Sequence, residues 1–174
     1  EEHDQLKMSI NLSARQFFQK KLLETIEGTI YRHKIPASNI EFEITESMMM
    51  MSIEETIGVL HELKIIGVQL SIDDFGTGYS SLSYLKKFPL NKLKIDKSFI
   101  DGLPDDKGDL AIVQATIAIA HSLGLIVIAE GVETIEQYNL LTQHQCNEIQ
   151  GYYFSKPLPG DEASEFLKNF SFEK

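Results

Sequence analysis

Residues 68–78 read Val-Gln-Leu-Ser-Ile-Asp-Asp-Phe-Gly-Thr-Gly, a short β-like run that ends in two aspartates and a glycine-rich loop. Val68 to Asp73 has the length and composition of a buried strand, and Gly67 before it is typical of the end of a helix. The loop lacks the lysine and the spacing of a Walker phosphate-binding motif. A buried strand that directly follows a helix indicates a parallel sheet covered by helices.

The same alternation of strand and helix extends along the whole chain. Strands are expected at residues 8–12, 40–46, 68–73, 92–96, 125–130 and 149–154. Helices are expected at residues 13–33, 52–65, 81–87, 106–123, 134–143 and 161–170. Such a series of units fits either an open doubly wound sheet or a closed barrel, and the barrel needs eight strands. Periodicity alone leaves both architectures open.

Two of the expected helices begin with a capping-box pattern. Ser52 is followed three residues later by Glu55, and Thr134 is followed by Gln137. In a capping box, the hydroxyl accepts a hydrogen bond from the backbone of the third residue, whose side chain reaches back to the cap. Both helices are therefore expected to start at these residues.

Composition limits the classes of function. With 174 residues, the chain can form one domain with a sizeable core. Its formal net charge of -10 argues against a DNA or RNA polymer as partner, although divalent cations can connect carboxylates to a small phosphate ligand. The single cysteine, Cys146, excludes an internal disulfide and favours a reducing compartment. No apolar run reaches the roughly 20 residues that cross a bilayer. We therefore expect a cytoplasmic location, with membrane anchoring of the parent protein left open.

Polar side chains gather where the expected strands end. These residues are Asn11, Glu43, Glu46, Asp73, Asp74, Lys94, Asp96, Glu130 and Gln150. The carboxyl ends of parallel strands form one rim, where ligands bind in α/β folds. Several carboxylates and an amide suit Mg²⁺ or Mn²⁺ better than zinc. Asp73 could bridge two ions while Asp74 binds one, and Lys94 could orient or activate a water molecule.

Each of these residues also has a simpler interpretation when taken alone. Asn11 could belong to a helix cap, Glu46 could be a solvated loop acid, and Lys94 could be a solvent-facing charge. Cys146 has no evident activating partner, and the sequence contains no Gly-x-Ser-x-Gly nucleophile motif. The simple interpretations fail jointly, because every strand from the first to the fifth ends in a candidate ligand.

Six segments in order along the chain resemble the EAL family of cyclic di-GMP phosphodiesterases. They are Asn11-Leu12-Ser13, Glu43-Ile44-Thr45-Glu46-Ser47, Asp73-Asp74-Phe75-Gly76-Thr77-Gly78-Tyr79-Ser80-Ser81-Leu82, Leu93-Lys94-Ile95-Asp96, Ile128-Ala129-Glu130-Gly131-Val132-Glu133 and Gln150-Gly151-Tyr152-Tyr153-Phe154-Ser155-Lys156-Pro157. The resemblance implies a modified TIM (β/α)₈ barrel, with about six of the eight β/α units present. Residues 1–174 would then be the C-terminal part of a single EAL phosphodiesterase domain.

The resemblance implies two metal sites. Asn11, Glu43 and Asp73 resemble the ligands of one ion. Asp73 and Asp74, together with Glu130, resemble the ligands of the second ion. The implied reaction is hydrolysis of cyclic di-GMP to linear pGpG with two Mg²⁺ or Mn²⁺ ions.

Further residues receive roles through the same resemblance. Lys94 resembles the water-activating lysine, and Glu133 and Gln150 resemble supporting or ligand-contacting residues. The loop from Asp74 to Ser81 resembles the one that shapes the substrate and dimer sites, and Glu46 resembles the glutamate that anchors this loop.

The chain departs from the family pattern at one point. The Glu-Ala-Leu motif, whose glutamate binds metal, and the arginine that follows it are absent from residues 1–174. We therefore expect this polypeptide to bind metal poorly and to hydrolyse slowly or not at all, and its open sheet edges to favour a homodimer. A non-catalytic cyclic di-GMP receptor is the alternative. The parent protein can carry an upstream sensory or GGDEF-type domain.

Overall fold

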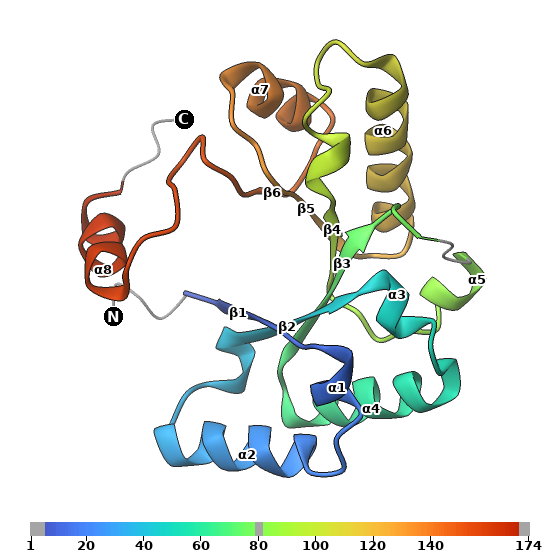
Figure 1. The fold of residues 1–174 in the computed structure, drawn as a ribbon, viewed down its shortest axis with the longest axis vertical. Helices are drawn as coiled ribbons and strands as arrows, with labels where there is room; N and C mark the ends of the chain where they lie inside the picture. Colours follow the sequence, from blue (N-terminus) through green and yellow to red (C-terminus); the bar gives the residue numbers. More distant parts are fainter. Residues whose placement is uncertain (1–5, 79–81, 171–174) are drawn as a thin grey trace.

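A curved sheet of parallel strands forms the centre of the molecule, with helices along its outer side and the last helix, Gly160–Asn169, standing apart from the sheet (Figure 1). The computed structural model describes residues 6–78 and 82–170. Within these ranges, the strands are β1 (Met8–Asn11), β2 (Ile40–Thr45), β3 (Gln69–Phe75), β4 (Lys92–Ile95), β5 (Ile126–Ala129) and β6 (Glu148–Ile149). The α-helices are α1 (Ala14–Phe17), α2 (Leu22–His33), α3 (Glu46–Met49), α4 (Ile53–Ile66), α5 (Leu82–Leu85), α6 (Lys107–Ser122), α7 (Ile135–Gln143) and α8 (Gly160–Asn169). Two 3₁₀ helices are η1 (Ala37–Asn39) and η2 (Lys97–Phe99).

The order of the strands decides between the two architectures. The sheet runs β1-β2-β3-β4-β5-β6, so each strand pairs with its neighbour in the sequence. A doubly wound sheet reverses its strand order at a switch point, and no reversal occurs among the described strands. The sheet is therefore a half-barrel of the modified TIM type, as the resemblance predicted.

Side-chain alternation gives the sheet an apolar outer face and a polar inner face. Apolar residues at alternate positions are buried among the helices: Phe42, Ile44, Leu70, Ile72, Leu93, Ile95, Val127 and Ala129. The intervening positions on β2 and β4 carry charge, and Glu41, Glu43, Lys92 and Lys94 are all buried. Because successive side chains of a strand point to opposite faces, these charges converge inside the half-barrel.

The helix expected at residues 13–33 is two helices, so this prediction was wrong. α1 ends at Phe17 and α2 begins at Leu22. Phe17 and Ile26 are both buried. Nine residues correspond to about two and a half helical turns, which would place these two side chains on opposite faces of one helix. The break between α1 and α2 lets both reach the core.

The last expected strand is also shorter than predicted. β6 ends at Ile149, and the chain then turns instead of continuing to residue 154. Val132 explains the turn: its N–H donates to the carbonyl of Gln150, and its carbonyl accepts from Tyr153. Gly151 lies so close to the Val132 backbone that a Cβ would collide with it.

The two capping boxes had different outcomes. Thr134 and Gln137 form the reciprocal pair at the start of α7. Ser52 is the N-cap of α4, as expected, but its side chain makes no capping hydrogen bond, so the capping-box prediction was wrong there. Its backbone, with φ -150° and ψ 83°, lies outside the extended conformation that is usual for an N-cap residue. Among the described residues, no helix is long and apolar enough to cross a membrane.

Candidate active site

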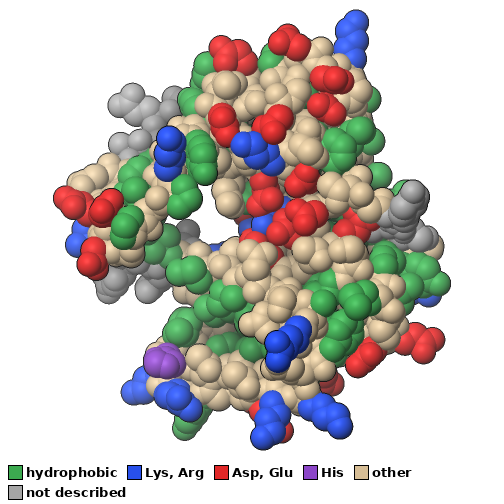
Figure 2. Space-filling model, in the orientation of Figure 1, with side chains coloured by type: hydrophobic (Ala, Val, Ile, Leu, Met, Phe, Trp, Pro, Cys, Tyr) green, Lys and Arg blue, Asp and Glu red, His purple; other side chains and the backbone are tan. Residues whose placement is uncertain are grey.

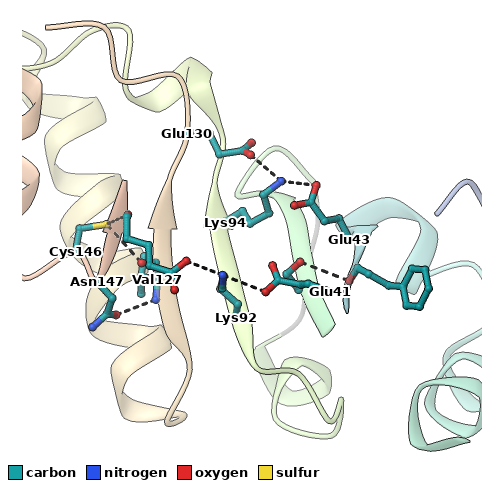
Figure 3. Close-up of polar contacts among 11 residues, drawn as sticks. Glu41, Glu43, Lys92, Lys94, Val127, Glu130, Cys146 and Asn147 are labelled. Carbon is teal, nitrogen blue, oxygen red and sulfur yellow. Dashed lines mark hydrogen bonds and ion pairs between the residues drawn. The ribbon is translucent and has the colours of Figure 1, made fainter. Parts of the chain in front are cut away.

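One buried ammonium group lies among three carboxylates at the carboxyl ends of the strands. Figure 3 shows its contacts with two of them, Glu43 and Glu130. The Nζ atom of Lys94 lies 2.7 Å from Glu43, 3.1 Å from Asp73 and 2.7 Å from Glu130. These residues come from β4, β2, β3 and the position directly after β5. We call these four side chains the Lys94 cluster. Figure 2 shows acidic and basic side chains gathered at the centre of this face of the molecule.

The register of the sheet explains how Lys94 reaches across β3. Glu43 on β2 is level with Ser71 on β3, and Ser71 is level with Lys92 on β4. Ser71 is fully buried and has a short side chain. It leaves space in which Lys94, two residues beyond Lys92, can bridge to Glu43 on the next strand but one.

Burial and ion pairing act in opposite directions on Lys94. Burial alone would lower its pKa, but hydrogen bonds to Glu130 and Glu43 outweigh that effect and raise the pKa above its ordinary value. Burial also raises the pKa of Glu130, although the bond to Lys94 opposes this. Lys94 therefore remains an ammonium group at neutral pH.

The cluster has an excess of negative charge that fits divalent cations. When its three carboxylates are ionised, the single ammonium leaves two negative charges uncompensated. Carboxylates this close together and shielded from water repel one another unless cations are nearby, and oxygen ligands suit Mg²⁺ or Mn²⁺. Within residues 6–78 and 82–170, no three His, Cys, Asp or Glu side chains already stand as a metal site. Cation binding would therefore draw carboxylates away from Lys94.

Two other expected metal ligands lie beside the Lys94 cluster rather than on its ammonium group. Asn11 is level with Glu43 in the β1–β2 register, and it is exposed. Asp74 has a left-handed backbone with φ 55°, and its N–H donates to the Asp73 carboxylate over 3.0 Å. Burial raises the pKa of Asp74, and the neighbouring charges of Asp73 and Asp96 add to that effect.

Glu46 contacts the glycine-rich loop directly. Its side chain is buried, and its Oε2 atom accepts a hydrogen bond of 2.9 Å from the backbone N–H of Gly76. Gly78 packs against the same carboxylate so closely that a Cβ there would lie 2.8 Å from Oε1. Ser81, also expected in the site, lies outside the described residues.

Glu133 and Gln150 lie on the rim. Glu133 accepts a hydrogen bond of 2.6 Å from Lys97, and both side chains are about half exposed. Gln150 is exposed directly after β6. The sequence did not lead us to expect Lys97 in the site. Its Nζ atom also lies 6.0 Å from the centroid of the Tyr152 ring. Its place directly after the Leu93-Lys94-Ile95-Asp96 segment was the available signal.

A second ionic cluster was missed as well. Lys92 lies 3.0 Å from Glu41 and 2.6 Å from Glu148, on the inner face below Lys94 (Figure 3). We call these three side chains the Lys92 cluster. Glu41 and Lys92 stand two residues before Glu43 and Lys94, so the same strand alternation could have identified them.

Comparison with known protein families identifies the family of this chain. The EAL domain matches residues 1–157. The chain belongs to the EAL domain family. The match covers all four residues of the Lys94 cluster and leaves residues 158–174 outside.

The relatives of this chain include a protein named as a cyclic di-GMP phosphodiesterase and one named as a signaling protein. Cyclic di-GMP phosphodiesterase NbdA of Pseudomonas aeruginosa is 43% identical over 171 residues, which are 98% of this chain and 22% of that protein. Signaling protein YkoW of Bacillus subtilis is 46% identical over 162 residues, which are 93% of this chain and 20% of that protein. The chain thus spans about a fifth of the length of these relatives.

The fold agrees with a solved EAL structure. The PaMucR phosphodiesterase in its c-di-GMP complex superposes with a TM-score of 0.88 at 42% sequence identity. The superposition covers 90% of this chain and 64% of that one. The half-barrel of parallel strands is therefore the EAL form of the TIM barrel.

Proposed function

We propose that this chain contributes most of the active site of a cyclic di-GMP phosphodiesterase, which hydrolyses the cyclic dinucleotide to linear pGpG. The observation that carries the proposal is the Lys94 cluster, in which Glu43, Asp73 and Glu130 converge on one buried ammonium. Membership of the EAL family supports the substrate, because NbdA is a cyclic di-GMP phosphodiesterase and the PaMucR phosphodiesterase has been solved with c-di-GMP.

Two divalent cations, Mg²⁺ or Mn²⁺, are part of the proposal. Asn11, Glu43 and Asp73 would hold one ion, and Asp73, Asp74 and Glu130 would hold the other. The negative excess of the cluster and its oxygen donors support this assignment. When bound, such ions supply Lewis-acid activation and charge stabilisation for phosphodiester hydrolysis.

Lys94 acts in its charged form. Its raised pKa makes it a poor proton acceptor, so it orients the attacking water by donating hydrogen bonds and stabilises negative charge that develops on the phosphate. Glu43 and Glu130 would hold the cations, and any N–H group of Lys94 that they no longer accept from would be free to donate to water or phosphate.

The rim residues would contact the dinucleotide beyond the reacting phosphate. Glu133, held by Lys97, and the exposed Gln150 lie on the rim next to the Lys94 cluster. Glu46 would keep the glycine-rich loop in place through Gly76. The open edges of the sheet support a homodimer or closure by further sequence, and an upstream sensory or GGDEF-type domain is part of the same proposal.

Turnover of cyclic di-GMP tests the proposal. The full-length protein encoded by the gene is incubated with cyclic di-GMP and Mn²⁺, and pGpG is separated by chromatography. We expect pGpG from the wild type and none after EDTA treatment. Calorimetric binding of cyclic di-GMP without any pGpG would replace the enzyme with a receptor, and absence of both would overturn the proposal.

A further inference from the structure

The Lys92 cluster joins three alternate strands of the half-barrel. Glu41, Lys92 and Glu148 come from β2, β4 and β6, and their two ion pairs measure 3.0 Å and 2.6 Å. Alternate strands of a TIM barrel contribute side chains to common interior layers, which bulky aliphatic residues usually fill. Here such a layer is ionic, and it lies directly beneath the Lys94 cluster (Figure 3).

The ion pairs of this layer are wholly or partly shielded from water, so their strength depends on the positions of the three side chains. The side chains of Lys92 and Glu41 are 8% and 2% exposed, whereas that of Glu148 is 40% exposed. Burial alone would lower the pKa of Lys92, but the bonds to Glu148 and Glu41 raise it overall. Aliphatic side chains tolerate sliding against one another, whereas a buried ion pair keeps its strength only in a narrow geometry.

The strands held by the lower layer also carry the upper one. Glu41 and Glu43 share one face of β2, and Lys92 and Lys94 share one face of β4. Glu148 on β6 is level with Ile128 on β5, two residues before Glu130. A change in the span from β2 to β6 at the lower layer therefore changes the separation of Glu43 and Glu130.

We propose that Lys92 is a positioning residue, whose ion pairs to Glu41 and Glu148 set the gap across which Glu43 and Glu130 face each other. Its effect on turnover rests on the proposed phosphodiesterase function, but its effect on geometry does not. A displacement of about 1 Å at a reacting centre can lower a rate by about 10²-fold. The lower layer therefore matters for catalysis without touching the substrate.

The test uses four variants of the full-length protein. Lys92→Arg keeps the charge, and Lys92→Met combined with Glu41→Gln and Glu148→Gln removes the whole charge set without leaving a lone buried carboxylate. Glu148→Gln alone removes the most exposed partner and should fold. Lys64→Met is the matched control, because Lys64 is a part-buried lysine that bonds to Asn91 before β4, outside both clusters.

We expect the triple variant to lower kcat about 10- to 100-fold while KM changes less than threefold. Lys92→Arg should restore most of kcat, Glu148→Gln should lower it about threefold, and Lys64→Met should leave it unchanged. If Lys92 only stabilised the fold, the triple variant would have a lower melting temperature but would not combine a large fall in kcat with a nearly unchanged KM. A triple variant that turns over within twofold of wild type would overturn the inference, as would an unchanged Glu148→Gln if the triple variant does not fold.

Two further readouts do not need turnover. The Cys146 thiol donates to the carbonyl of Glu148 over 3.2 Å, so its alkylation, followed on the Cys146 peptide, reports on β6. A crystal structure of the triple variant gives the separation of the Glu43 and Glu130 carboxylates. Faster alkylation and a separation changed by about 1 Å support the inference even if the wild type proves inactive. Unchanged alkylation together with an unchanged separation contradicts it.

Discussion

Lys92 and Lys94 lie two residues apart on the same face of β4, yet their surroundings differ. Lys92 faces two carboxylates, Glu41 and Glu148, below the rim. Lys94 faces three carboxylates at the rim. With all carboxylates ionised, the Lys92 cluster keeps one uncompensated negative charge and the Lys94 cluster keeps two. We therefore expect added cations to bind the Lys94 cluster, at the rim, in preference to the Lys92 cluster. In the roles proposed above, the Lys92 cluster positions the strands and the Lys94 cluster acts on the substrate.

The largest expected effect comes from removing the upper ammonium. Lys94→Met should lower the rate of cyclic di-GMP hydrolysis by about 10²- to 10³-fold, because a positioned cationic donor is lost at the reacting phosphate. Chromatographic initial rates measure it, with Lys64→Met as control. A loss smaller than that of the Lys92 triple variant would reverse the assignment of roles to the two lysines.

The next largest effect is expected on the affinity for Mn²⁺, which should depend on the carboxylates of the Lys94 cluster more than on those of the Lys92 cluster. Glu130→Gln should weaken Mn²⁺ binding at least 10-fold, because it removes a carboxylate from the acidic excess. Glu148→Gln keeps all three carboxylates of the Lys94 cluster and changes only their spacing, so it should weaken Mn²⁺ binding less than threefold. Paramagnetic resonance of free Mn²⁺ gives both affinities, and equal losses would contradict the distinction.

Glu46 tests whether the rim depends on a contact outside both clusters. Glu46→Ala leaves the N–H of Gly76 without its carboxylate acceptor and should lower the free energy of unfolding by about 1–3 kcal/mol. Urea denaturation measures this change. Glu54→Ala, at an exposed position in the first turn of α4, is the control and should cost less than about 1 kcal/mol. Equal costs would show that Glu46 does not anchor the loop.

The smallest effect is expected at alkaline pH. The pKa of Lys94 is raised above its ordinary value of 10.5 in the folded chain, so above that pH the folded state keeps a proton that the unfolded state has lost. The stabilisation is complete below about pH 10.5 and declines as the pH rises toward the folded pKa. Denaturation experiments between pH 9 and 12 should show that the free energy of unfolding declines less steeply with pH for Lys94→Met than for the wild type. Equal slopes would mean that Lys94 is not held by its carboxylates.

Much of this arrangement could be predicted from the order of residues. Alternation on β2 and β4 placed Glu43 and Lys94 on one face, and the strand ends placed Asp73 and Glu130 on one rim. The choice of a barrel needed the resemblance, because six alternating units also fit an open sheet. Nothing in the local sequence showed that Lys94 would bind three carboxylates at once, since that depends on the curvature of the sheet and the short side chain of Ser71.

The failures have local physical causes. The break between α1 and α2 follows from two buried residues, Phe17 and Ile26, that one helix would place on opposite sides. The early end of β6 follows from the close contact of Gly151 with Val132, which are distant in sequence. The Lys92 cluster was missed because charges inside a strand are easily taken for solvent-facing ones, although β4 is buried on both faces.

We propose that divalent cations, when bound, take the place of Lys94 as the partner of at least one carboxylate of the Lys94 cluster. Anomalous diffraction at the manganese edge, from crystals of the full-length protein soaked in Mn²⁺, tests it most directly. We expect peaks about 2–2.5 Å from oxygens of Glu43, Asp73 and Glu130, with Lys94 released from at least one of them. Ion pairs that still hold all three carboxylates on Lys94, with no peak beside them, would contradict the account.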